Sequence, residues 1–198
     1  MRLIVIGATG TIGQAVVAAL GKRHEVVPVT RRTEPFRVDI SSAASVRALF
    51  EHIGPIDGVI CAAGAARFKP LADLSDDDFA FCLQNKLMGQ VHIVREAVKC
   101  VRDRGVIVVT SGILSRAPTP GSSAISLVNA GLEAFARAAA LEAPRGIRIN
   151  VVSPPWVSET LTKLRMDPNL GLTASTVAEA YVDVVQGSMT GQVIELIA

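Results

Sequence analysis

The chain has 198 residues, of which 49% are hydrophobic and 19% charged, and its formal net charge is +2. This length fits a single domain over residues 1–198, and the composition excludes a disordered or low-complexity chain. No apolar run reaches the roughly 18 residues of a membrane span, no basic cluster favours nucleic acid, and the amino terminus lacks a secretory pattern. We therefore expect a cytoplasmic protein with neither a membrane nor a nucleic-acid partner.

Short apolar runs alternate with longer amphipathic segments along the chain. The runs expected to be strands lie at residues 3–6, 26–29, 36–40, 58–63, 106–110, 147–152 and 192–197. The helical patterns lie at residues 11–21, about 42–53 with Ser41 or Ser42 as the cap, 75–102, 124–142 and 176–185. This alternation predicts an α/β fold with a doubly wound parallel sheet of about six to seven strands. Too few residues separate Arg32 from Phe36 for a crossover helix, so the strand at 36–40 is expected to be short or poorly paired.

A glycine-rich turn, Gly7-Ala8-Thr9-Gly10-Thr11-Ile12-Gly13, joins the first strand to the first helix. Such a turn lets backbone N–H groups and the helix N-terminus face a pyrophosphate, and glycine allows the close approach. Its spacing differs from Gly-x-Gly-x-x-Gly, and no Gly-Lys-Ser/Thr follows, which disfavours a P-loop NTPase. The turn predicts dinucleotide binding on a Rossmann-type sheet, with a purely structural turn as the alternative.

With this turn, the chain resembles the short-chain dehydrogenase/reductase family over nearly its whole length. The resemblance also rests on Asp39-Ile40, Cys61-Ala62-Ala63-Gly64, residues 147–154 and residues 191–194. It implies an oxidoreductase in which Asp39 contacts the adenine and the backbone at Val157 holds the nicotinamide. Pro155 replaces the glycine usual at that turn. The expected cofactor-binding residues are Gly7, Thr9, Gly10, Thr11, Ile12, Gly13, Arg31, Arg32, Asp39, Ile40, Ala62, Ala63, Gly64, Lys86, Pro154 and Val157.

The end of the second strand indicates which dinucleotide is preferred. An NAD enzyme usually carries an acidic residue here for the ribose 2′-hydroxyl, whereas this chain has Thr30, Arg31 and Arg32. Arginine can bind a 2′-phosphate through two hydrogen bonds, so we expect NADP(H) rather than NAD(H). Arg31 is the first candidate, assisted by Arg32 or Thr30, and two solvated loop arginines are the alternative.

The resemblance implies catalysis by Ser, Tyr and Lys, with an Asn on the long helix, but only the Ser has a direct match. Ser111 ends the strand at 106–110, where the alternative is a serine that caps local backbone. The Tyr-x-x-x-Lys positions hold Ile125 and Asn129, or Ala124 and Val128 in a register one residue earlier. The chain has one tyrosine, Tyr181, which we place on an outer helix where it cannot replace the missing acid.

Lys86 stands where the family has its Asn, while Asn129 stands where the family has its Lys. We interpret this as an exchange of the two groups across the active site, against the alternative of a surface lysine beside an inert asparagine. Consecutive helical residues diverge by about 100°, so Asn85 and Lys86 are not expected to face the cofactor equally. Ser111, Lys86 and Asn129 are therefore the candidate catalytic residues.

Together these patterns predict an NADP(H)-dependent oxidoreductase acting on a small carbonyl or alcohol with an atypical active site. The alternative is a catalytically weak or inactive NADPH-binding sensor or scaffold. Trp156 and Arg67 are further candidates for substrate contact, with packing and solvated roles as alternatives. The helix at 124–143 has apolar residues on more than one face, which predicts a homodimer or homotetramer. No metal is expected, because the cysteines and histidines lack ligand spacing (Cys61, Cys82, Cys100, His24, His52 and His92).

Overall fold

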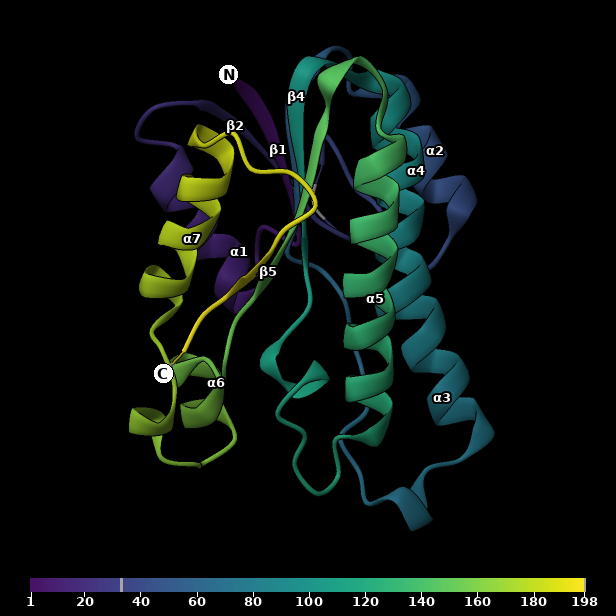
Figure 1. Ribbon diagram of the computed structural model, residues 1–198, viewed down its shortest axis with the longest axis vertical. Helices are drawn as coiled ribbons and strands as arrows, with labels where there is room; N and C mark the ends of the chain where they lie inside the picture. Colours follow the sequence, from purple (N-terminus) through teal and green to yellow (C-terminus); the bar gives the residue numbers. More distant parts are fainter. Residues whose placement is uncertain (33, 198) are drawn as a thin grey trace.

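The computed structural model describes residues 1–32 and 34–197, which form one parallel sheet with helices on both faces (Figure 1). The strands are β1 (Arg2–Ile6), β2 (Glu25–Val29), β3 (Ile56–Cys61), β4 (Val101–Thr110), β5 (Arg148–Ser153) and β6 (Val193–Glu195). They lie in the order β2-β1-β3-β4-β5-β6, and every neighbouring pair is parallel. This order, with its reversal between β1 and β3, confirms the doubly wound fold of Rossmann type.

The helices divide between the two faces of the sheet. They are α1 (Thr11–Leu20), α2 (Ala43–His52), α3 (Asp76–Cys82), the π-helical segment η2 (Leu83–Met88), α4 (Gly89–Cys100), α5 (Ser123–Glu142), α6 (Ser158–Lys163) and α7 (Ala174–Gln186). Short 3-10 turns occur at Leu71–Asp73, Ile113–Ser115, Pro144–Gly146 and Pro168–Leu170. Helices α1 and α7 cover one face, whereas α2, α4 and α5 cover the other (Figure 1).

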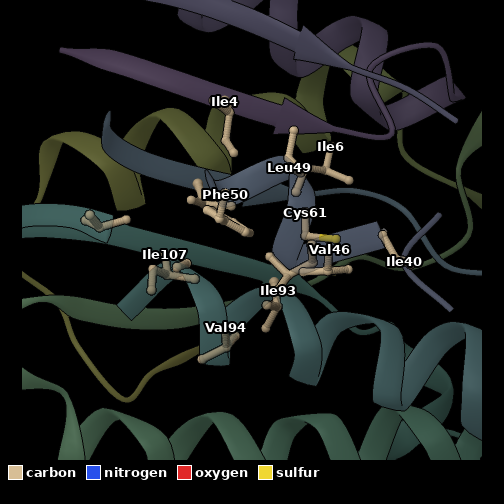
Figure 2. Close-up of a cluster of buried hydrophobic side chains, with 14 of the residues drawn as sticks. Ile4, Ile6, Ile40, Val46, Leu49, Phe50, Cys61, Ile93, Val94 and Ile107 are labelled. Atoms are coloured by element: carbon tan, nitrogen blue, oxygen red, sulfur yellow. The ribbon is translucent and has the colours of Figure 1, made fainter. Parts of the chain in front are cut away.

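The core follows the alternation of side chains along the strands. Ile4 and Ile6 of β1 face α2 and α4, whereas Leu3 and Val5 face α1 and α7. Figure 2 shows the first of these clusters, in which strand residues meet Phe50 and other apolar side chains of α2 and α4. Because both faces are covered, the strands are apolar throughout, as the sequence of β1 already indicated.

The segment at 36–40, expected to be a short or poorly paired strand, is poorly paired and does not form a regular strand. One parallel bridge joins Thr30 to Arg37, and the Val38 N–H donates to the Thr30 carbonyl at 2.8 Å. Because the connection from β2 is too short to hold a crossover helix, the segment passes the edge of the sheet without joining it.

The long helical pattern differs in detail from expectation. The pattern at 75–102 forms three consecutive helical pieces, with η2 between α3 and α4, and ends at Cys100. Tyr181 lies on α7 as expected, and its side chain is fully buried against the sheet. Its hydroxyl hydrogen-bonds Thr110 Oγ1 at 2.8 Å, and burial raises the pKa of the phenol. Tyr181 is therefore a core residue and no replacement for the missing catalytic acid.

Helix α5 is long and apolar enough to cross a membrane by length and composition, with a mean hydropathy of 1.3, contrary to the expectation that no such run exists. Its position in the fold gives another reason for its apolar character. Val128, Leu132 and Ala136 are buried in the core, and Asn129 and Glu133 are buried beside them. We therefore describe α5 as a core helix.

Candidate functional site

Two neighbouring cavities open where β1, β3, β4 and β5 end. The first has a volume of about 470 Å³ and is bounded by the glycine-rich turn, the segment after β2 and the turn after β3. Its lining includes Gly7, Thr9, Thr30, Arg31, Arg32, Asp39, Ile40, Ala63, Gly64 and Asn85. The crevice at the carboxyl ends of the strands is where open α/β sheets bind their ligands. The structure thus brings together eight of the expected cofactor residues at this cavity.

The glycine-rich turn owes its shape to close backbone contacts. Gly7 has φ +86°, and a Cβ there would approach the Ala62 carbonyl carbon and the Ala63 nitrogen to 2.9 Å. Gly13 packs directly against the Gly7 carbonyl, where a side chain has no room. Gly10 is the N-cap of α1 and offers no side-chain cap, and the first turn of α1 has no acidic residue. The N–H groups at this helix end therefore have no carboxylate or side-chain cap from α1 itself, which leaves them able to bind an anion.

Arg31 and Arg32 are exposed at the mouth of the first cavity, and neither forms an ion pair within the described part of the chain. Asp39 lines the same cavity and accepts hydrogen bonds from the Ser41 hydroxyl at 2.6 Å and the Ser41 N–H at 3.0 Å. These bonds, with the charge of Arg31, hold the pKa of Asp39 below its ordinary value. The cavity is therefore lined by a carboxylate that Ser41 holds in place and by two guanidinium groups without an ion pair among the described residues.

The second cavity, of about 190 Å³, brings the three candidate catalytic residues together. It is lined by Ile12, Lys86, Ser111, Gly112, Ile113, Leu114, Ile125, Asn129, Pro154, Pro155, Trp156, Val157 and Thr160. Ile125 and Asn129 face this cavity, whereas Ala124 and Val128 are fully buried beside Cys82. The first of the two registers considered for the Tyr and Lys positions is therefore the one that fits the geometry.

Lys86 extends into the protein rather than into solvent. Its side chain is half-buried, and Nζ donates a hydrogen bond to the Ser111 carbonyl at 3.1 Å. Within the described residues it has no carboxylate partner, and burial lowers the pKa of the amine from 10.5 to about 8. The alternative of a surface lysine does not describe this side chain.

The π-helical segment explains why two consecutive residues both reach the site. Asn85 lines the first cavity and Lys86 the second, in line with the expectation that the two residues do not face the cofactor equally. A π-turn closes i→i+5 instead of i→i+4 hydrogen bonds and is therefore wider than an α-turn. Such segments are frequent at functional sites, but the sequence carries no local signal for this one.

Asn129 leaves one buried polar atom without a partner. Its side chain is 1% exposed, and Nδ2 donates to the Gly112 carbonyl at 3.2 Å. Oδ1 is buried and has no hydrogen-bond partner among the described residues. A buried acceptor without a donor is costly, so this atom fits a ligand that brings a donor into the second cavity. The hydroxyls of a ribose are donors of this kind.

Ser111 belongs to a buried hydroxyl–carboxylate cluster that sequence reasoning missed. Its hydroxyl donates to Glu133 Oε1 at 2.8 Å, and the Ser115 and Ser153 hydroxyls donate to the same oxygen at 2.8 and 3.3 Å. Glu133 is 4% exposed and lies one helical turn after Asn129, so its spacing of four residues from that candidate on the same helix was an available signal. Ser111 therefore does not cap local backbone. With its proton directed to Glu133, its oxygen can accept a hydrogen bond from a ligand.

The remaining site candidates are placed as follows. Ile12, Pro154 and Val157 line the second cavity, while Gly10, Thr11, Gly13 and Ala62 belong to the turns beside the two cavities. Trp156 lines the second cavity and packs edge-on against Phe68, with ring centroids 5.9 Å apart. Arg67 pairs with Asp78 at 3.5 Å and stacks on Phe81, so it is engaged within the protein. Lys163, which the sequence did not single out, donates to Thr11 Oγ1 at 2.9 Å.

Comparisons with known proteins agree with this fold. A family model described as enoyl-(acyl carrier protein) reductase matches residues 7–182. The 3-oxoacyl-[acyl-carrier-protein] reductase of Mus musculus is 28% identical over 168 residues, which cover 82% of this chain and 67% of the relative. The protein lin1944 from Listeria innocua superposes with a TM-score of 0.95 at 35% identity over the full length of both chains. A small-chain dehydrogenase in complex with NADPH superposes with a TM-score of 0.88 at 28% identity, covering 99% of this chain and 96% of the other.

Proposed function

The chain belongs to the short-chain dehydrogenase/reductase family, and from that membership we propose that it is an NADP(H)-dependent oxidoreductase acting on a small carbonyl or alcohol. The observation that carries the proposal is the second cavity, where Ser111, Lys86 and Asn129 face the same space. These three polar side chains come from three different elements of the fold. Their convergence beside the glycine-rich turn is the arrangement that a hydride-transfer site needs.

The proposed cofactor extends from the first cavity to the second. Asp39 and Ile40 flank its adenine end, the N-terminus of α1 faces its diphosphate, and Asn129 Oδ1 accepts a hydrogen bond from its nicotinamide ribose. Arg31 and Arg32 support NADP(H) over NAD(H), because both charges are unpaired within the described residues and no acidic residue ends β2. The NADPH complex of the related small-chain dehydrogenase agrees with this preference.

When bound, the cofactor supplies or accepts the hydride, and the chain's own residues manage the substrate oxygen. Lys86 is the proposed proton donor during reduction, since burial already places its pKa at about 8, near working pH. As an ammonium it also stabilises negative charge that develops on that oxygen. Ser111 orients the substrate by accepting a hydrogen bond, because its own proton is directed to Glu133. The apolar walls formed by Ile113, Leu114 and Ile125 favour a small, weakly polar substrate.

The test of this proposal is NADPH oxidation, followed by absorbance, with a panel of aldehydes, ketones and quinones. Turnover of one of these classes is the expected result. Tight NADPH binding without turnover of any of them would reject the enzyme and leave a cofactor-binding protein.

A second function is favoured by one specific observation, the apolar Ile125 at the place of the family's tyrosine. In this alternative the protein is a sensor or scaffold that distinguishes NADPH from NADP⁺ without turning over a substrate. It predicts that assembly or partner binding differs between the two redox forms of the cofactor. Equal behaviour with both forms, together with measurable catalysis, would eliminate it.

A further inference from the structure

One lysine from the carboxyl-terminal part of the chain reaches the glycine-rich turn. Lys163 ends α6, and its Nζ donates a hydrogen bond to the hydroxyl of Thr11, the first residue of α1, at 2.9 Å. The two residues are 152 positions apart in the sequence. The contact therefore depends on the whole fold and brings a positive charge to the helix end that the proposed cofactor would face.

Lys163 is exposed, so water screens its charge, but the nearby end of α1 offers that charge no compensation in the protein alone. The N-terminus of a helix carries a partial positive charge, so an ammonium beside it is repelled. Gly10 supplies no side-chain cap, and the first turn of α1 contains no acidic residue that would offset the repulsion. An anion placed between Lys163 and the N–H groups of α1 would attract both positive groups, so that both would contribute to its binding.

The partner that Lys163 would normally have within its own helix is engaged elsewhere. Glu159 precedes it by four residues, the spacing at which a glutamate and a lysine commonly pair. Both Glu159 carboxylate oxygens instead accept the Ala174 N–H, at 3.0 and 2.9 Å, at the start of α7. Among the residues that the structure places, no carboxylate forms an ion pair with Lys163. Its charge is therefore available to a ligand.

The segment that carries Lys163 is anchored at its base. Val157 and Leu172 form a parallel bridge, the Ser158 N–H donates to the Leu172 carbonyl at 2.8 Å, and the Leu172 N–H donates to the Trp156 carbonyl at 2.9 Å. Leu161 is fully buried, which fixes α6 against the body of the protein. Lys163 is thus held above the turn by an ordered arm.

We propose that Lys163 binds the diphosphate of the dinucleotide together with the N-terminus of α1. The proposal rests on the cofactor site of the proposed function, but it does not depend on turnover. A diphosphate supplies the negatively charged partner that Lys163 and the end of α1 do not have in the protein. Its oxygens accept hydrogen bonds from an ammonium and from backbone N–H groups alike. Lys163 would thereby couple the carboxyl-terminal arm to cofactor binding.

The test compares NADPH with adenosine 2′-phosphate, which keeps the adenosine and its 2′-phosphate but lacks the diphosphate and the nicotinamide riboside attached to it. NADPH and adenosine 2′-phosphate are titrated by calorimetry into the wild type, Lys163→Ala, Lys163→Arg and the control Lys22→Ala, which changes an exposed lysine beyond the other end of α1. Lys163→Ala should lower the affinity for NADPH by about tenfold or more, because loss of a charged hydrogen bond lowers affinity roughly ten- to 150-fold. The same variant should bind adenosine 2′-phosphate with an affinity within about twofold of that of the wild type. Lys163→Arg should keep most of the NADPH affinity, and Lys22→Ala should change neither ligand.

A thermal melt without ligand separates binding from folding. Lys163→Ala should melt no lower than the wild type, because it removes a cation from a helix N-terminus. Unchanged NADPH affinity in Lys163→Ala, or an equal loss for both ligands, would overturn the inference while leaving NADPH binding by the wild type intact. A wild type that binds no NADPH would instead overturn the proposed function on which the inference rests.

Discussion

At the scale of single residues, Lys86 is the side chain whose placement most needs a functional reason. Its ammonium is partly removed from water and has a backbone carbonyl, rather than a carboxylate, as its partner. Such a group destabilises the folded protein in the absence of a ligand, since an apolar side chain would fill the same space without the cost of desolvation. Residues that lower stability in this way are common where binding or catalysis needs them.

The first prediction concerns the role of Lys86 in binding. Lys86→Ala should lower the affinity for NADPH by roughly ten- to 150-fold, the range expected for loss of a charged hydrogen bond. Asn129→Ala, which removes a neutral acceptor, should have the smaller effect. Calorimetric titration measures both, and unchanged affinity and turnover in Lys86→Ala would end the exchange hypothesis. The triple variant Lys86→Asn, Ile125→Tyr and Asn129→Lys, which restores the family pattern, should keep NADPH binding and provides the matched control.

The second prediction is a pH dependence of stability. In the folded protein Lys86 titrates at about 8, whereas in the unfolded chain it titrates near 10.5, so between these values the unfolded state binds more protons. The contribution of Lys86 to the free energy of unfolding should therefore rise with pH from about 8 to about 10.5. Lys86→Met lacks this titration. Its advantage over the wild type should be largest below pH 8 and shrink as pH rises.

Urea titrations of the wild type and Lys86→Met at pH 7 and pH 9.5 measure this difference, since other titrating groups cancel between the two proteins. A stability difference that is constant across these pH values would show that Lys86 is ionised freely in the folded protein.

At the scale of elements, local patterns in the sequence predicted most helices and strands. The apolar period and the capping residues placed α2, where Ser42 rather than Ser41 accepts the hydrogen bond from the Ser45 N–H, and placed α5 within one residue. The π-helical segment depends on packing between elements, for which a local period carries no signal, whereas the poor pairing at 36–40 follows from the short connection after β2. The contacts of Lys163 with Thr11 and of Ser111 with Glu133 likewise join separate elements and could not be found locally.

The third prediction concerns the link between α4 and β4. Gln90 is fully buried, and its side-chain amide donates to the Thr110 carbonyl at 2.9 Å and accepts from the Thr110 N–H at 2.8 Å. It takes the place of a neighbouring strand at the end of β4, since the pairing of β3 with β4 ends at Cys61 and Val109. Gln90→Leu would leave two buried backbone groups unpaired, so it should lower the free energy of unfolding by about 2–4 kcal/mol.

Chemical denaturation of Gln90→Leu and of a matched variant, Gln84→Leu, on the exposed side of the same helical region tests this link. Gln84 donates a single long hydrogen bond of 3.4 Å and should cost little when replaced. Equal stability of the two variants would show that the Thr110 backbone finds other partners.

At the scale of the whole molecule, the candidate site is assembled from nearly the full length of the chain. The glycine-rich turn lies near residue 10, Lys86 and Ser111 lie in the middle, and Trp156 and Lys163 come from the last quarter. The order of elements was enough to predict that the ends of the parallel strands share one edge of the sheet. Which side chains face one another across that edge is decided by packing, and Glu133 and Lys163 were missed for that reason.

The last prediction concerns self-association through α4 and α5, which lie side by side on one face of the sheet (Figure 1). Leu127 and Leu141 of α5 are 49% and 90% exposed. Ala134 and Ala138 are exposed between them at helical spacing, so one stripe of the helix remains apolar and uncovered. We expect a homodimer or homotetramer that buries this stripe, because contiguous exposed apolar patches mark interfaces.

Light scattering at micromolar concentration should give the mass of two or four chains. The double variant Leu127→Glu and Leu141→Glu should have the mass of one chain, because it places charges in the interface. Leu170→Glu changes a leucine that is 62% exposed in the arm between α6 and α7 and serves as the control, since it should leave the mass unchanged. If the wild type is monomeric, the stripe on α5 is not an interface between copies of this chain. If Leu170→Glu alone dissociates the assembly, the contact lies at the carboxyl-terminal arm, beside Lys163, and cofactor binding and assembly would then share one element.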